Sequence, residues 1–220
     1  KERSGLVLSR DKTYLLENRL MPVARKRMMN SLDELFATLR AQNDEELIRD
    51  VTEAMTTNES FFFRDQKPFD QFTDIVLPHL LEARKSMRTF RVWSAACSSG
   101  QEPYTLAMLL KEHADKLGGW RVEIVATDLS NEILDKAKEG LYSQFEVQRG
   151  LPITHLVKYF VQVEDRWQIE DSLRKMIKFQ QFNLLGDLSS LGKFDVVFCR
   201  NVLIYFDTPT KTKALIGIAD

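Results

Sequence analysis

The chain has 220 residues, of which 44% are hydrophobic and 29% are charged, an ordinary composition for a globular protein of one or two domains. Its 31 basic and 32 acidic residues leave a formal net charge of −1, so no overall field favours nucleic acid or an anionic membrane as partner. Two cysteines exclude a disulfide scaffold, and no His/Cys cluster, no run of about 18 apolar residues and no signal-peptide core occurs. We therefore expect a cytoplasmic protein that binds no metal, binds no nucleic acid and is not inserted in a membrane.

Residues 1–60 are predicted to be helical throughout. Ser9 or Asp11 is placed to cap a first amphipathic helix, which Pro22 then kinks or restarts. Capping-box signatures at residues 31–34 and 43–46 each precede a further amphipathic segment. Because strand patterns are absent here, the sequence predicts a small all-α domain, followed by a linker and a first helix.

From residue 90 the hydropathy pattern changes to alternating strands and helices. Short apolar segments that are typical of buried strands occur at residues 91–96, 121–127, 176–182 and 194–199. This alternation predicts an α/β domain over residues 90–220, after the linker and helix of residues 61–89, with a mostly parallel sheet covered on both faces.

The alternation lapses between residues 141 and 175. Residues 160–163 and 166–169 have the character of two short strands, and Glu164 with Asp165 would form the turn between them. We therefore expect a small inserted β-subdomain in this stretch.

Both ends of the sequence indicate that it is a piece of a longer chain. The chain starts without Met, and it stops at Asp220 inside a helix expected at residues 210–219. We expect further chain after this point, including the last strands of the sheet.

The ends of the predicted strands carry polar or small residues, as in the ligand crevice of a doubly wound sheet. Asp128 closes the second strand, where a carboxylate can hold the two hydroxyls of a ribose. The alternative is that Asp128 only caps the next helix, although Ser130 is better placed to do so. Taken alone, the loop after the first strand is explained as well by an ordinary strand-to-helix turn as by a ligand-binding loop. Together, the strand ends favour nucleoside binding.

The loop after the first strand indicates which nucleoside. A dinucleotide needs the glycines of GxGxxG, whereas this loop has one glycine, Gly100, and an acid, Glu102. Glu102 would repel a diphosphate but suits a cationic ammonium or sulfonium group. S-adenosylmethionine is thus favoured over NAD, and an oxidoreductase is disfavoured.

Five short blocks occur in a characteristic order: Asn58-Glu-Ser-Phe-Phe-Phe-Arg64, Trp93-Ser-Ala-Ala-Cys-Ser-Ser-Gly-Gln-Glu-Pro-Tyr104, Ala126-Thr-Asp-Leu-Ser130, Phe182-Asn-Leu-Leu185 and Phe198-Cys-Arg-Asn-Val-Leu-Ile-Tyr-Phe206. Together they resemble the CheR family, the chemotaxis receptor glutamate O-methyltransferases, over roughly residues 6–207. The resemblance implies an N-terminal receptor-recognition domain and a class I, Rossmann-like, S-adenosylmethionine-dependent methyltransferase domain with an inserted β-subdomain. It also implies transfer of a methyl group to glutamate carboxylates of membrane chemoreceptors, giving methyl esters in chemotaxis adaptation.

The resemblance also implies which residues hold S-adenosylmethionine and its product S-adenosylhomocysteine. They are Asn58, Ser60 and Arg64 on the linker side, Glu102 and Asp128 at the methionine end and the ribose, Asn183 and Leu184 along the adenine, and Arg200 with Asn201 closing the pocket. Ser60 stands where the family often has Thr, and the hydroxyl is kept.

Two residues are candidates for a direct role in methyl transfer. A glutamate carboxylate, with a pKa of about 4.3, is already ionised at neutral pH and needs no general base. It needs to be held in line with the methyl–sulfur bond, and the planar fork of arginine suits that task. We expect Arg64 to orient the carboxylate and Tyr205 to steer it or line the methyl path. The alternatives are a surface ion pair of Arg64 with Asp65 or a neighbouring acid, and core packing of Tyr205 beside Phe206.

The expected partner is the cytoplasmic helical region of a membrane chemoreceptor. Arg19 and residues 25–27 could place a basic face on the second N-terminal helix, although a solvated helix face is nearly as good an explanation. The short hairpin turn at residues 162–166 lacks glycine, which indicates an enzyme that does not bind a receptor's C-terminal pentapeptide. We expect a monomer. The alternative functions are a degenerate S-adenosylmethionine-binding adaptor and a class I methyltransferase with another substrate.

Overall fold

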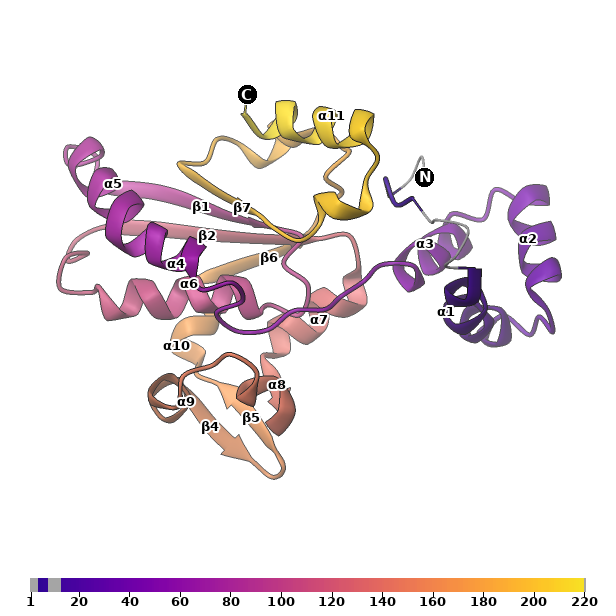
Figure 1. The fold of residues 1–220 in the computed structure, drawn as a ribbon, viewed down its shortest axis with the longest axis horizontal. Helices are drawn as coiled ribbons and strands as arrows, with labels where there is room; N and C mark the ends of the chain where they lie inside the picture. The colour runs from indigo at the N-terminus through magenta and orange to yellow at the C-terminus, as the bar shows by residue number, and fades with distance from the viewer. Residues whose placement is uncertain (1–3, 8–12, 220) are drawn as a thin grey trace. The chain divides into compact units, whose positions relative to one another are not determined.

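A computed structural model describes residues 4–7 and 13–219 of the chain (Figure 1). The chain divides into two compact units. The first unit includes residues 13–57 and 201–219, and the second unit comprises residues 58–200. Within the described ranges, no helix has both the length and the apolar character needed to cross a membrane.

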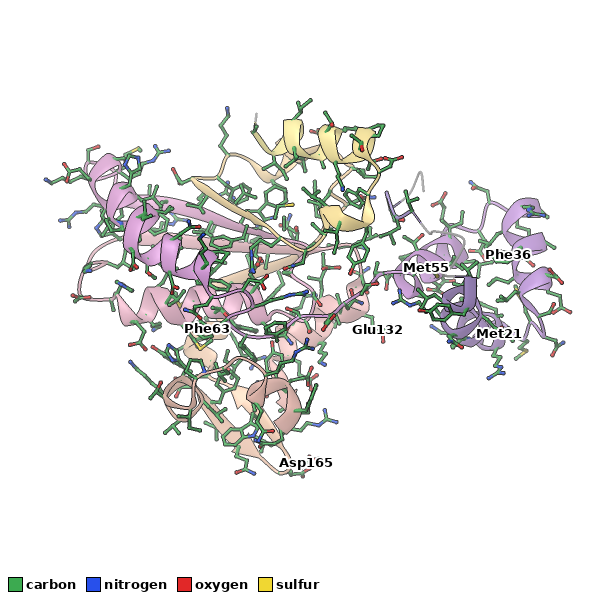
Figure 2. The ribbon with its side chains drawn as sticks, in the orientation of Figure 1. Met21, Phe36, Met55, Phe63, Glu132 and Asp165 are labelled. Carbon is green, nitrogen blue, oxygen red and sulfur yellow. The ribbon has the colours of Figure 1, made fainter. Side chains whose placement is uncertain are left out.

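Three helices form the N-terminal part of the first unit: α1 (Thr13–Lys26), α2 (Leu32–Ala41) and α3 (Glu45–Ala54). This confirms the predicted all-α domain. Phe36 and Met55, labelled in Figure 2, are partly buried against the core of these helices. The core itself consists of four buried side chains, Leu20, Ala24, Leu35 and Leu47.

Of the two effects expected of Pro22, a kink or a restart of the first helix, the restart does not occur, because the helix continues through the proline to Lys26. Leu20 and Ala24, on either side of the proline, are both buried in the same core, and this packing holds the helix in one piece. The basic residues 25–27 therefore lie at the end of the first helix and not on the second.

The caps of the next two helices follow the predicted signatures with one shift. The Ser31 side chain accepts the N–H three residues further on, at 3.2 Å. The third helix is capped by Asp44, whose carboxylate accepts two backbone N–H groups, and not by Asn43, the first residue of the predicted signature. The predicted cap at Ser9 or Asp11 lies outside the described residues.

The other part of the first unit contains helix α11 (Thr208–Ala219), which begins two residues before the predicted start. Leu6 forms an isolated antiparallel bridge with Phe206, and the N–H of Val7 donates to the carbonyl of Tyr205 at 3.0 Å. This short pairing links residues far apart in the sequence.

The second unit is built on a parallel sheet with the strand order β6-β2-β1-β7. All four predicted strands are confirmed, with ends that differ by at most two residues from the prediction. They are β1 (Thr89–Ala95), β2 (Arg121–Asp128), β6 (Ile177–Gln181) and β7 (Val196–Cys199).

Helices α6 (Gln101–Glu112) and α7 (Asn131–Glu139) follow the first two strands, as predicted. Tyr104 of α6 packs against Phe179 of β6, with ring centroids 5.7 Å apart. Before the sheet, one continuous helical segment comprises α4 (Lys67–Gln71), a π-helical turn (Phe72–Val76) and α5 (Leu77–Ala83). Phe69 and Phe72 of this segment pack against Phe198 of β7.

The two cysteines lie at the ends of the neighbouring strands β1 and β7. Cys199 stands opposite Ala95 in the β1–β7 pairing, and Cys97 follows β1 by two residues. Both are free thiols. Burial raises the pKa of Cys97 well above its ordinary value and that of Cys199 to about 11, so both thiols are protonated and unreactive at neutral pH.

The inserted β-subdomain is present between α7 and β6. The predicted hairpin has the predicted ends, β4 (Phe160–Val163) and β5 (Arg166–Ile169), and Asp165 lies at its tip (Figure 2). A third strand, β3 (Leu141–Ser143), extends the sheet in the order β3-β5-β4, and at three residues it is too short for a periodic signal. Helices α8 (Gln144–Gln148), α9 (Ile153–Tyr159) and α10 (Asp171–Arg174) complete the insertion.

Candidate active site

A largely buried carboxylate, that of Glu102, lies in the first turn of α6, directly after the loop that follows β1. The Oε1 atom of Glu102 accepts a hydrogen bond from the hydroxyl of Ser94 at 2.8 Å, and its Oε2 atom accepts one from Arg200, also at 2.8 Å. Only 13% of the side chain is exposed. Burial raises the pKa of Glu102, while the hydroxyl and the guanidinium oppose that rise. The carboxylate is therefore held in one orientation by two donors.

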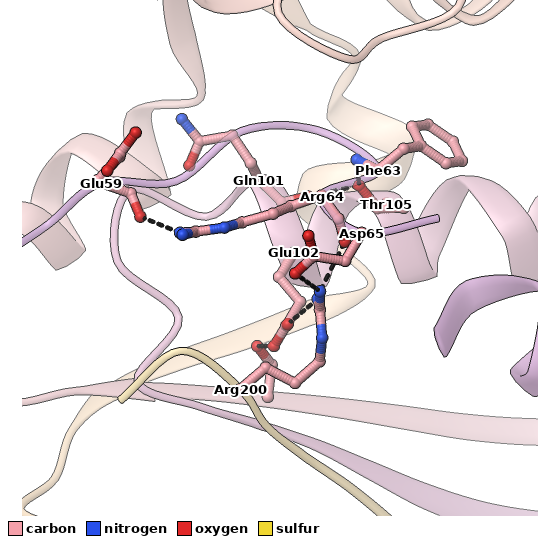
Figure 3. Close-up of polar contacts among 9 residues, drawn as sticks. Glu59, Phe63, Arg64, Asp65, Gln101, Glu102, Thr105 and Arg200 are labelled. Carbon is pink, nitrogen blue, oxygen red and sulfur yellow. Dashed lines mark hydrogen bonds and ion pairs between the residues drawn. The ribbon is translucent and has the colours of Figure 1, made fainter. Parts of the chain in front are cut away.

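Arg200, the first residue after β7, links this carboxylate to the linker before the sheet (Figure 3). Its Nη2 atom donates to the carbonyl of Arg64 at 2.6 Å and to the carboxylate of Asp65 at 3.1 Å. The guanidinium also lies 5.2 Å from the ring centroid of Phe69. One arginine thus joins the fourth predicted strand, the start of α6 and the linker.

Asp128, the last residue of β2, is the second buried acid at this edge of the sheet. Its carboxylate accepts the N–H of Ser98 at 2.8 Å and the N–H of Ser130 at 3.2 Å. The Ser130 hydroxyl caps α7 by accepting the N–H of Ile133. Because Ser130 makes the cap, the alternative role of Asp128 as a helix cap does not account for it.

The loop that carries Ser98 is also tied to the linker, because the Ser98 hydroxyl donates to the carbonyl of Asn58 at 2.9 Å. On the other side of Asp128, the N–H of Phe182 donates to the Asp128 carbonyl at 2.9 Å. Asn183 and the buried Leu184 follow Phe182 directly and therefore lie beside β2. The residues predicted for the ribose and the adenine are thus neighbours.

Arg64 lies half-buried on the linker, with the half-buried Ser60 four residues before it. Its Nη1 atom donates to the carbonyl of Glu59 at 2.7 Å, as Figure 3 shows, and its guanidinium lies 5.3 Å from the ring centroid of Phe61. The carboxylate of Asp65, the alternative partner of Arg64, is paired with Arg200. An Arg64–Asp65 ion pair therefore does not explain why an arginine occupies this position.

Comparison with known proteins decides the family. Residues 58–220 match the family described as "CheR methyltransferase, SAM binding domain", and residues 1–56 match "CheR methyltransferase, all-alpha domain". The chain belongs to the CheR methyltransferase family. S-adenosylmethionine is its cofactor, as the strand ends predicted.

Curated relatives of the chain carry consistent names. "Chemotaxis protein methyltransferase 1" of Pseudomonas aeruginosa is 44% identical over 97% of this chain and 79% of its own length. "Chemotaxis protein methyltransferase Cher2" of Pseudomonas putida is 41% identical over the same shares. A "Chemotaxis protein methyltransferase" of Borreliella burgdorferi is 36% identical over 94% of this chain and 75% of its own length.

The donor set of the CheR site fits S-adenosylmethionine chemically. This cofactor carries an ammonium and a sulfonium cation as well as a ribose diol. Glu102 supplies a largely buried carboxylate held by two donors, and Asp128 supplies a second, buried carboxylate at the neighbouring strand end. The loop after β1 has a single glycine, Gly100, in the left-handed conformation with φ of 91°, and lacks the glycine pattern of a diphosphate cradle.

Two of the predicted site residues belong to the other compact unit. Asn201 is exposed and has a φ of 57°, and Tyr205 is half-buried in a 3-10 turn (Leu203–Tyr205). The predicted closure of the pocket by Asn201 and the predicted steering of the carboxylate by Tyr205 stay predictions. The roles of the other site residues toward the cofactor stay predictions as well.

Sequence reasoning missed two residues that hold the predicted ones in place. Ser94 is fully buried in β1, and a hydroxyl in the apolar second half of this strand was a usable signal, because a buried polar group requires a partner. Asp65, which pairs with Arg200, is an exposed linker acid and gave no such signal.

The backbone around the site is also unusual, since several non-glycine residues have positive φ, a conformation that concentrates at functional sites. They are Phe63, Asp65, Ala96 and Ser98, with φ between 52° and 58°. Of these types only Asp favours a left-handed backbone, so the residue types do not predict it at Phe63, Ala96 and Ser98.

Proposed function

We propose that this chain methylates glutamate side chains of membrane chemoreceptors and so produces glutamate methyl esters in chemotaxis adaptation. The observation that carries the proposal is that both CheR domains, the all-alpha one and the SAM-binding one, match in one polypeptide and in sequence order. Relatives named as chemotaxis protein methyltransferases support the same substrate class.

In this proposal the acids of the site bind and orient the cofactor. When bound, S-adenosylmethionine supplies an electrophilic methyl group on a sulfonium. Glu102 holds the cationic methionine end, with its carboxylate oriented by Ser94 and Arg200. Asp128 holds the ribose, next to Asn183 and Leu184 along the adenine.

The substrate carboxylate needs orientation and desolvation, because it is already ionised at neutral pH. Arg64 is the proposed orienting group, and its Nη1–Glu59 carbonyl bond and its position over Phe61 hold the guanidinium on the linker. It should not bind the ground state so tightly that the carboxylate loses nucleophilicity. Tyr205 is proposed to steer the carboxylate or to line the path of the methyl group.

We propose that the end of α1 contacts the receptor. Fewer basic side chains are free for this contact than the sequence indicated. Arg27 forms salt bridges with acids of its own unit, among them Asp50 at 3.0 Å, and Arg19 donates to backbone carbonyls near the end of α3. Arg25 and Lys26 are exposed at the end of α1. These two cations are the ones we propose to face an acid-rich receptor helix.

The proposal is tested by incubating the full protein with methyl-labelled S-adenosylmethionine and membranes that carry chemoreceptors. Label should appear on the receptor and be released by mild base, because methyl esters are hydrolysed by base whereas N-methyl groups are not. Base-stable label would indicate another methyltransferase class. No label with a broad receptor panel, despite cofactor binding, would favour the adaptor.

We also propose that the enzyme acts without binding a receptor's C-terminal pentapeptide. The turn between β4 and β5 consists of Glu164 and Asp165 alone, with Glu164 at a φ of 54°, so the hairpin offers no extended glycine loop. A free receptor-tail peptide titrated into the protein should show no measurable heat at micromolar concentration. Micromolar binding would contradict this part of the proposal.

The proposal also covers the location of the enzyme in the cell and its oligomeric state. The helical region of a chemoreceptor that is methylated lies in the cytoplasm, and we place the enzyme there as a monomer. Light scattering on the purified full protein would reveal a dimer, if one forms, and cell fractionation would reveal any other location.

A further inference from the structure

The inserted β-subdomain makes a buried hydrogen bond to the loop that follows β1. The hydroxyl of Tyr142, in strand β3, donates to the carbonyl of Ser99 at 2.7 Å. Tyr142 is fully buried, and burial raises its pKa well above that of an ordinary phenol. The hydroxyl therefore stays protonated at any physiological pH and remains a donor to this carbonyl.

This bond fixes one end of a peptide group that is also fixed at its other end. The carbonyl of Ser99 and the N–H of Gly100 belong to the same planar peptide unit. The Gly100 N–H donates to the carbonyl of Cys97 at 3.1 Å, while the Ser99 carbonyl accepts from Tyr142. Because Ser98 and Gly100 both have positive φ, at 52° and 91°, the loop needs such restraints to keep its conformation.

The conformation of this loop sets the position of cofactor-binding groups. The N–H of Ser98 donates to the Asp128 carboxylate and its hydroxyl to the Asn58 carbonyl. Gly100 is the N-cap residue of α6, and Glu102 lies in the first turn of that helix. A rotated Ser99–Gly100 peptide would therefore disturb the partner of Asp128 and the start of the helix that carries Glu102.

A second contact of the subdomain supports the linker. The ring of Phe62 packs edge-on against Tyr142 and Phe160, with centroid distances of 5.1 and 5.5 Å. A Cβ atom on Gly150, which has a φ of 85°, would lie 2.2 Å from the Phe62 carbonyl oxygen. The linker backbone thus approaches the subdomain so closely that only glycine fits there.

We propose that Tyr142 is a positioning residue for S-adenosylmethionine, through which the inserted β-subdomain supports the cofactor loop. The inference rests on the proposed roles of Asp128 and Glu102. It assigns the subdomain a part in cofactor binding that is separate from any contact it makes with a receptor.

The test compares Tyr142→Phe with Tyr104→Phe in the full protein. Both tyrosines are fully buried, and the Tyr104 hydroxyl also donates to a backbone carbonyl at 2.7 Å, but to that of Ala137 in α7. Loss of the Tyr142 hydroxyl should raise the Kd of S-adenosylhomocysteine about 3- to 10-fold, the equivalent of one hydrogen bond. The Kd should stay unchanged in the Tyr104 variant, with a similar loss of thermal stability in both variants.

Steady-state kinetics and hydrogen exchange add independent readouts. The KM for S-adenosylmethionine should rise in Tyr142→Phe while kcat stays near the wild-type value. In the wild type, S-adenosylhomocysteine should slow amide exchange in residues 97–100 and also in residues 141–143, since coupling between sites is reciprocal.

Equal Kd values for the two variants, or unchanged exchange at residues 141–143 on binding, would overturn the inference. A wild-type protein that does not bind S-adenosylhomocysteine would instead contradict the proposed roles of Asp128 and Glu102. The two failures are thus distinguishable.

Discussion

Replacing Glu102 with glutamine should weaken binding of S-adenosylmethionine by about 100-fold or more, because a charge-assisted contact is lost in a buried site. The substitution keeps the shape of the side chain but removes the negative charge that the cationic cofactor requires. It also leaves the guanidinium of Arg200, now 15% exposed, without one of its two carboxylate partners. Titration calorimetry with S-adenosylmethionine measures the effect directly.

Glu123→Gln is a matched control. Glu123 of β2 accepts a hydrogen bond from Arg91 at 2.7 Å, so this variant also removes one carboxylate from an arginine, but away from the strand ends. Its cofactor affinity should equal that of the wild type. Unchanged affinity in Glu102→Gln would exclude Glu102 from the cofactor site.

The pH dependence of binding gives a second signature of Glu102. Because burial raises the pKa of Glu102, the carboxylate becomes protonated at a pH above that at which an ordinary glutamate does. Cofactor affinity should therefore fall as the pH is lowered from neutral through this raised pKa, and the fall should be absent in Glu102→Gln.

The effect of Glu102 on stability should have the opposite sign. A carboxyl whose pKa is higher in the folded than in the unfolded state binds more protons when folded, so its contribution to the free energy of unfolding is lost as the pH rises through the folded pKa. Lowering the pH should thus weaken binding while the contribution of this one group to stability improves. Denaturant unfolding of the wild type and Glu102→Gln at several pH values isolates that contribution.

Arg64→Ala should lower kcat about 100-fold while the Kd of S-adenosylmethionine changes only a few-fold. The proposed task of Arg64 is to orient the substrate carboxylate, and misplacement of a reacting group by about 1 Å is enough for a loss of this size. Its side chain contacts the carbonyl of Glu59 and the ring of Phe61, and both are on the linker. Turnover with receptor membranes and calorimetry with the cofactor measure the two effects separately.

Arg149→Ala controls for the loss of a cation at the same aromatic ring. The Arg149 guanidinium lies 4.4 Å from the ring centroid of Phe61 and pairs with Glu59. This variant should keep kcat close to the wild-type value. Equal losses of turnover and cofactor affinity in Arg64→Ala would show that Arg64 binds the cofactor and does not orient the carboxylate.

Local sequence signals were sufficient for most of the secondary structure. The apolar strands, the Ser130 cap and the hairpin turn at Glu164 and Asp165 each depend on residues within a few positions of one another. The same holds for the identity of the two acids, because Glu102 lies in the first turn of the helix that follows β1 and Asp128 is the last residue of β2. At Pro22 the local signal, a proline that ends or kinks a helix, was opposed by packing. The helix continues there because Leu20 and Ala24, on either side of the proline, are buried in the same core.

The sequence by itself therefore determined the four strands of the parallel sheet, the β4–β5 hairpin, the Ser31 and Ser130 caps, the cofactor class and the family of this protein. Only the tertiary structure decided how the acids are held. Arg200 donates to Glu102, which lies 98 residues away in the sequence, and to the carbonyl of Arg64, which lies 136 residues away. Tyr142 donates to the carbonyl of Ser99, which lies 43 residues away. Partners at such separations leave no periodic trace in the sequence, because folding of the whole sheet and its insertion is what brings them within hydrogen-bonding distance.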